Sequence, residues 1–141
     1  MSTVEKSRPE TDEPAPRLRY PIGNKNPNLP FHPAVRAGDF VFVSGQVAKD
    51  ANGNMVEGTI EVETQATIDA IRRILAEDGV SLADVVRVTT YLQDARDFGR
   101  YNKVFAANFT EAGLGRTTVA ARAVIATKIE MDAIAYSPRK A

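Results

Sequence analysis

Two runs near the end of the chain combine strand-forming residues with charged side chains that could do chemistry. The first, GRTTVAARAV (115–124), begins with Arg116 after a Gly-Leu-Gly loop, and the second, KIEMDAIAY (128–136), carries Glu130 and Asp132. A guanidinium at the end of a sheet can hold a planar carboxylate through two parallel hydrogen bonds. A carboxylate on a strand can act as a general base or position a water molecule. Arg116 and Glu130 are therefore the first candidates for a reactive site.

Each of these charged side chains also has a structural explanation. Side chains alternate along a strand, so Lys128, Glu130 and Asp132 share one face. A solvated outer face accounts for two carboxylates more readily than catalysis does, because exposed acids are ordinary. Arg116 could equally pair with an acid at the surface, and Arg122 is a weaker candidate for the same carboxylate-binding role. The residues alone leave these alternatives open.

Polar residues inside two apolar segments are further candidates. Asn102 lies four residues after Phe98 and three before Phe105, on the side of a helix that should be packed. Its amide needs partners there; strand backbone is the favoured partner and a substrate the second. Ser44 and Gly45 interrupt an apolar strand where the backbone can approach a ligand closely. With no histidine or lysine nearby in sequence, Ser44 is a better hydrogen-bond donor than nucleophile.

The composition excludes several classes of protein. The 141 residues suit one domain, and 18 basic residues balance 18 acidic ones, so no net field attracts nucleic acid or an anionic membrane. The chain has no cysteine and a single histidine, His32, which excludes thiolate nucleophiles and histidine-pair or cysteine-built metal sites. His32 is expected to be structural. Neither a membrane span nor a secretion signal is recognisable, so we expect a cytoplasmic protein.

The apolar pattern predicts the elements that position these residues. β-Branched and aromatic runs predict strands at 39–48, 85–92, 115–124 and 128–136, with a hairpin over DANGNM. The unbroken apolar run at 39–48 suggests a central strand covered on both faces. Apolar residues at helical spacing predict helices at about 62–78 and about 97–112. This order predicts an α+β domain with both helices against one face of a mixed sheet.

The amino-terminal segment differs in composition from the rest. Residues 1–16 are charged and proline-rich with almost nothing to bury, so we expect a disordered tail. Residues 17–33 stay rich in Pro, Asn and Gly, which predicts an irregular arm. A single domain is expected to span 17–141.

Several ordered motifs together resemble the RidA family, the reactive-intermediate deaminases formerly described as L-PSP endoribonucleases. The resemblance runs from about Pro30 to Tyr136, and its motifs are AVRAGDFVFVSGQ, ETQATIDAI, DVVRVTTYLQDARDFGRYNKVF, RTTV and IEMDAIA. It implies a chorismate-mutase-like α+β fold assembled as a homotrimer with clefts between subunits. It also implies hydrolysis of 2-imino and enamine acids, of the 2-aminoacrylate and 2-iminobutanoate type, to 2-keto acids and ammonia, with no metal and no cofactor.

The resemblance also implies roles for individual residues. The family's carboxylate-binding arginine falls on Arg116 and its water-orienting glutamate on Glu130. Its helix asparagine falls on Asn102, and its cleft-lining serine and glycine fall on Ser44 and Gly45. The arginine and the glutamate are expected on adjoining strands, meeting across a small anionic ligand between protomers.

The chain departs from the family pattern at three places, one of which is the short segment that joins the second predicted helix to Arg116. The family's usual tyrosine after the proline of the arm is Phe31 here, followed by His32, so any hydrogen bond from that phenol is lost. The stretch between Arg116 and Glu130 is one residue shorter than is typical. Alternative functions are deamination of another enamine acid, such as 2-aminomuconate, or binding of a small carboxylate without catalysis. RNA cleavage ranks last, because the sequence has no histidine pair, metal cluster or basic stripe.

Overall fold

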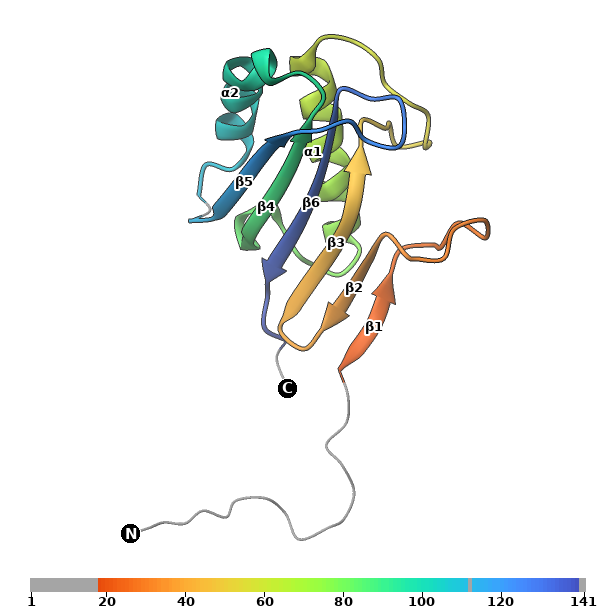
Figure 1. Ribbon diagram of the computed structural model, residues 1–141. Coiled ribbons are helices and arrows are strands. Elements are labelled where there is room, and N and C mark those ends of the chain that lie inside the picture. The colour runs from red at the N-terminus through yellow and green to blue at the C-terminus, as the bar shows by residue number, and fades with distance from the viewer. Residues whose placement is uncertain (1–17, 112, 140–141) are drawn as a thin grey trace, which may run out of the picture.

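A computed structural model describes residues 18–111 and 113–139, so the expected tail at 1–16 lies outside the described residues. The described part is a six-stranded mixed sheet with two α-helices on one face, which confirms the predicted α+β class (Figure 1). The strand order is β1-β2-β3-β6-β4-β5. The strands are β1 (Arg19–Ile22), β2 (Ala34–Ala37), β3 (Phe40–Val47), β4 (Val85–Leu92), β5 (Gly115–Ala120) and β6 (Ile129–Tyr136).

The pairing of the strands fixes which residues share a face. All neighbouring strands are antiparallel except β4 and β5, which are parallel and are joined by the crossover that contains helix α2 (Phe98–Asn108). In β4 and β5, Val88 pairs with Arg116. In β4 and β6, Tyr91 pairs with Glu130. Val88 is fully buried beneath the helices, whereas Tyr91 is partly exposed on the other face.

Helix α1 (Ile60–Ala76) covers the middle of the sheet. It begins two residues earlier than expected because the Thr59 hydroxyl accepts a hydrogen bond from the backbone N–H of Val62 and caps the first turn. After the helix, Gly79 adopts φ +72°, a conformation that disfavours side chains and ends the helix as expected. The apolar stripe of α1 is buried at Ile68, Ile71, Ile74 and Leu75.

Helix α2 is shorter than the sequence predicts, since it ends at Asn108 rather than near 112. Three rings of its predicted aromatic stripe pack inward: Tyr101, Phe105 and Phe109 are buried, and successive rings lie in contact. The fourth, Phe98 in the first turn, is 45% exposed, so the prediction that the whole stripe is buried was wrong there. The hydroxyl groups of Tyr101 and Thr90 lie 2.6 Å apart in the core. This hydrogen bond ties α2 to β4.

Three predictions about strands were wrong. Strand β3 is central but alternates, with Val41 and Val43 buried and Phe40 and Phe42 about two-fifths exposed, because both helices lie on one face of the sheet. The run 115–124 forms a strand only to Ala120, and 121–127 is a loop. Strands β1 and β2, at the amino-terminal end of the described chain, were missed. Pro21 is tolerated in β1 because β1 is an edge strand.

The face of the sheet opposite the helices, here called the open face, carries an aromatic cluster. Phe40, Phe42 and Tyr136 lie there with ring centroids 5.3 to 6.4 Å apart and remain about 40 to 46% exposed. Within 18–111 and 113–139, no element covers this face (Figure 1). None of the helices in the same ranges is long and apolar enough to cross a bilayer.

Candidate functional site

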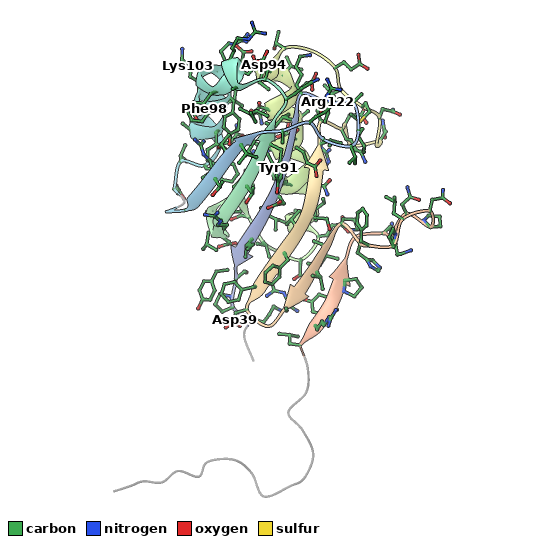
Figure 2. The ribbon with its side chains drawn as sticks, in the orientation of Figure 1. Asp39, Tyr91, Asp94, Phe98, Lys103 and Arg122 are labelled. Atoms are coloured by element: carbon green, nitrogen blue, oxygen red, sulfur yellow. The ribbon has the colours of Figure 1, made fainter. Side chains whose placement is uncertain are left out.

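Glu130 lies on the open face, in the middle of the sheet. It pairs with Tyr91 of β4, and Asp132, two residues on, pairs with Thr89. In Figure 2 the labelled Tyr91 lies in front of the sheet, away from the helices. The predicted sharing of one face by the two carboxylates of β6 is therefore confirmed.

A bulge in β3 brings Gly45 against Glu130. The register between β3 and β6 shifts between Val43 and Gln46, which reorients the backbone at Ser44 and Gly45. A Cβ atom at Gly45 would overlap Oε2 of Glu130 and stand 3.0 Å from its Cδ. The glycine therefore leaves the space in which the carboxylate lies.

The Glu130 carboxylate lines a cavity of ≈ 330 Å³, here called the Glu130 cavity. Its other walls come from the irregular arm, the β3 bulge and the loop 121–127, and they include Leu29, Phe31, Gly45 and Ile125. Phe31 is half exposed, so its ring is available to a ligand. The structure thus brings together three of the predicted site residues: Phe31, Gly45 and Glu130.

The surroundings of Glu130 favour its protonated form. Partial burial, and then the nearby negative charge of Asp132, raise the pKa of Glu130. Burial also raises the pKa of Asp132, although the Tyr91 hydroxyl at 3.4 Å and Arg87 oppose that shift. Asp132 in turn raises the pKa of Tyr91. A carboxylate whose pKa moves toward neutrality is better matched to proton transfer.

Ser44 occupies the bulge but faces a different space. Its hydroxyl donates a hydrogen bond to the main-chain oxygen of His32 at 2.8 Å, which anchors the arm to β3. Ser44 lines a neighbouring cavity of ≈ 440 Å³ that shares Phe31 with the Glu130 cavity. Because the hydroxyl proton is already engaged, Ser44 can offer a ligand an acceptor without rearrangement.

Arg116 lies on β5, on the face that carries the helices. Its guanidinium carbon is 5.7, 5.0 and 4.7 Å from the ring centroids of Phe98, Tyr101 and Phe105, here called the aromatic shelf. No acidic side chain within 18–111 and 113–139 lies in ion-pair distance of this guanidinium. Sequence reasoning identified the aromatic stripe but missed its role as a support for Arg116.

Asn102 extends from the same stripe of α2 as the aromatic shelf. It follows Phe98 by four residues and precedes Phe105 by three, and both rings lie against the Arg116 guanidinium. Its Oδ1 atom is buried and lacks a hydrogen-bond partner in the described part of the chain. The sequence favoured a hydrogen bond between this amide and the backbone of a strand. No such bond is formed at Oδ1 in the described part of the chain. Arg122, the weaker candidate, is exposed on the loop after β5 (Figure 2).

The two groups of predicted residues lie on opposite faces of the sheet. Arg116 shares the helix-bearing face with Val88, whereas Glu130 shares the open face with Tyr91. The expectation that β5 and β6 adjoin was wrong, because β4 lies between them. Two side chains on opposite faces of one sheet cannot both contact one small molecule within a single chain.

The other described polar residues bear on whether the chain could hold a metal ion. Across residues 18–111 and 113–139, no group of three or more His, Asp or Glu side chains is arranged to hold a metal ion. His32 lies in the arm, where its main-chain oxygen accepts the hydrogen bond of Ser44.

Comparisons with known proteins place these features in a family. The family model described as Endoribonuclease L-PSP matches residues 23–137. A RutC family protein of Pyrococcus abyssi is 41% identical over 126 residues, covering 88% of this chain and 92% of its own length. The structure of yeast Mmf1 superposes with TM-score 0.80 at 27% identity, over 85% of this chain and 99% of its own. RidA from a Psychrobacter species gives TM-score 0.75 at 29% identity, over 83% and 98%.

Proposed function

The chain belongs to the RidA family, whose model is described as Endoribonuclease L-PSP, and we propose that it is a hydrolytic deaminase of 2-imino and enamine acids. The observation that carries this proposal is the setting of Glu130. Its carboxylate lies in a cavity, against a glycine, with its pKa raised by burial. Such a group can accept a proton from water near neutral pH. Imine hydrolysis needs such a base and a group that holds the substrate in place.

Arg116 holds the carboxylate of the substrate in this mechanism. Neutral rings support its guanidinium and no acid of the described chain neutralises it, so its charge is available to an anion. The Asn102 amide, on the same stripe of α2, adds a polar contact to the bound molecule. Fixing the carboxylate fixes the adjacent imine carbon, and such positioning supplies several kcal/mol, about 7 at the lower end for well-aligned groups.

Glu130 directs the water in this mechanism. The carboxylate takes a proton from water as the water oxygen bonds to the electrophilic carbon of the protonated imine, giving a tetrahedral amino alcohol. The carboxylic acid then returns this proton to the nitrogen. As the carbon–nitrogen bond breaks, the carboxylate takes the hydroxyl proton and passes it to the departing ammonia, so that a 2-keto acid and ammonium leave. No oxidant, reductant or covalent enzyme intermediate is needed, and Gly45 allows the carboxylate its close position.

The proposed site forms between copies of the chain, as a homotrimer with three equivalent clefts. One copy supplies Arg116 and Asn102 from its helix-bearing face, and its neighbour supplies Phe31, Gly45 and Glu130 from the Glu130 cavity. The opposite-face arrangement supports this division, because neither group is complete alone. The uncovered aromatic cluster of Phe40, Phe42 and Tyr136 on the open face gives the copies an apolar surface to bury.

Turnover of freshly generated imino acids by an Arg116→Ala variant tests the proposal. We expect wild-type protein to accelerate release of keto acid from 2-aminoacrylate and 2-iminobutanoate. We expect the variant to lose roughly 100-fold or more in kcat/KM, with circular dichroism and oligomeric mass unchanged. Normal turnover by the variant would exclude Arg116 as the carboxylate-binding group.

A wild-type protein that binds 2-ketobutyrate without hydrolysing any imino acid would instead be a carboxylate-binding module. Including 2-aminomuconate in the substrate panel separates a different enamine substrate from the absence of catalysis.

A further inference from the structure

Glu63, a buried acid on α1, joins segments that are far apart in the sequence. Its side chain is almost fully buried, with 3% of the residue exposed. It lies in the first turn of the helix, where the dipole favours a negative charge. None of its contacts involves a residue assigned above to the proposed reaction, so its burial needs a separate explanation.

Both carboxylate oxygens of Glu63 accept hydrogen bonds from the segment that leads into β6. Oε1 accepts the main-chain N–H of Lys128 at 2.9 Å and the hydroxyl of Thr127 at 3.4 Å. Oε2 accepts the ammonium of Lys128 at 3.2 Å and the main-chain N–H of Gly58 at 3.1 Å. The Lys128 ammonium also donates to the main-chain oxygen of Gly58 at 2.8 Å. We call this set of contacts the Glu63 clamp.

The Glu63 clamp holds two parts of the Glu130 cavity. Lys128 precedes Glu130 by two residues, so the clamp fixes the point from which β6 enters the sheet. Thr127 ends the loop 121–127, whose Val124 and Ile125 form one wall of the cavity. Val124 is fully exposed and Ile125 is about half exposed, so apolar packing alone does not anchor this wall. In the described part of the chain, this end of the loop is held by the contacts of Thr127 and Lys128 to Glu63 and by the Lys128 ammonium on the Gly58 main-chain oxygen. The Thr127 hydroxyl also donates to the main-chain oxygen of Ile129, and the Gln93 N–H donates to that of Lys128.

Glu63 is expected to be ionised in the folded protein. Burial alone raises the pKa of its carboxyl, but hydrogen bonds from the backbone N–H groups of Lys128 and Gly58, with the Lys128 ammonium, lower it further than burial raises it. The clamp is therefore a charge-assisted network rather than a neutral hydrogen bond, and such bonds are roughly twice as strong.

We propose that Glu63 is a positioning residue for the deaminase site: through Lys128 and Thr127 it holds Glu130 against Gly45 and keeps the apolar wall of the cavity in place. This inference rests on the proposed function for its effect on catalysis. Its contacts in the described chain are to Gly58, Thr127 and Lys128, so Glu63 would act on the reaction through these residues. Because Arg116 lies on another element and, in the proposed assembly, on another copy, loosening the clamp should affect the chemical step and spare carboxylate binding.

Two substitutions of Glu63 test the role. In Glu63→Gln an amide nitrogen replaces one carboxylate oxygen and faces donors that already point at it, and Glu63→Ala removes the clamp entirely. The matched control is Asp78→Asn, because Asp78 is a second largely buried acid at the other end of α1 and holds Arg36, Tyr20 and Arg139 instead. The kcat of each Glu63 variant is compared with the kcat of the control when both have lost the same amount in Tm.

The first readout is steady-state turnover of 2-iminobutanoate. A misplacement of about 1 Å at a reacting group can cost about 100-fold, so we expect kcat to fall roughly 10- to 100-fold in the Glu63 variants with KM within about twofold. We expect Asp78→Asn to leave kcat nearly unchanged. Equal kcat losses at equal Tm, or a rise in KM alone, would overturn the proposal.

The second readout does not depend on activity. Carboxyl ¹³C titration by NMR should show the pKa of Glu130 falling toward its ordinary value in Glu63→Ala, because water enters the loosened cavity. An unchanged Glu130 pKa would overturn the proposal that Glu63 positions Glu130. If Glu63→Ala does not fold, Lys128→Met provides the same titration with the main-chain contact intact. Lack of turnover by wild-type protein refutes the proposed function, while this titration still decides the role of Glu63.

Discussion

The contact between Gly45 and Glu130 gives a prediction whose magnitude follows from the structure. In Gly45→Ala the new methyl group overlaps the carboxylate oxygen of Glu130, which must withdraw by about 1 Å to reach an ordinary separation. Displacing a reacting group by about 1 Å costs about 100-fold in rate, or about 2.7 kcal/mol of transition-state stabilisation. Gly45 does not adopt a positive φ, so alanine introduces no backbone strain there.

The same substitution should have little effect on stability. The group that must move is the end of a flexible side chain beside a cavity, so we expect a stability change below about 1 kcal/mol. The assay is kcat/KM for 2-iminobutanoate together with the Tm of each variant. Gly99→Ala is the matched control, since nothing lies within 4 Å of a Cβ added on α2. Wild-type kcat/KM in Gly45→Ala would refute the reasoning that the position of Glu130 against this glycine controls the reaction.

Further predictions concern the acids of the chain. Glu130→Gln should lower kcat by about 10² to 10⁴ while the Kd of 2-ketobutyrate, measured by calorimetry, changes little, because the amide cannot accept the proton. The pKa of Glu130 is raised, and its carboxylate form is the base. The kcat/KM should therefore increase with pH, and the midpoint of this increase should lie above the ordinary pKa of a glutamate. Asp78 and Glu63 have lowered pKa values in the folded protein, so their stabilisation is present above their unfolded pKa values and is lost as pH falls through about 4 and below. Thermal melts from pH 7 to 3 should show that loss, and Asp78→Ala should remove about 3 kcal/mol at pH 7 by leaving Arg36 buried without its carboxylate.

Most of the fold could be predicted because local signals and tertiary packing agree. The strand at 85–92 is rich in β-branched residues, and the structure begins and ends β4 at the predicted residues. Strand β3 shows where the prediction fails. Its apolar run is continuous, yet Val41 and Val43 are buried while Phe40 and Phe42 stay about two-fifths exposed. No sequence pattern distinguishes a sheet face that a helix covers from one that no helix covers.

The candidate site could be predicted as a set of residues but not as an arrangement. Residue type and spacing singled out Arg116 and Glu130, and the register shows the two on opposite faces with β4 between them. That separation depends on strand order, which connections between elements leave undetermined. Glu63 was not singled out because its partners Thr127 and Lys128 lie 64 and 65 residues away in the sequence. Only folding brings a helix turn beside the entry to β6.

The proposed division of the site between copies of the chain has a genetic consequence. In an assembly of the proposed kind, a chain lacking Arg116 still carries an intact Glu130, and a chain lacking Glu130 still carries an intact Arg116. Two inactive alleles expressed together would therefore rebuild working clefts at roughly one interface in four if copies mix freely around a cyclic trimer. Each substitution would inactivate only the clefts to which the altered copy contributes that side chain. A cell that holds both defective forms would therefore keep part of the activity that neither form has alone.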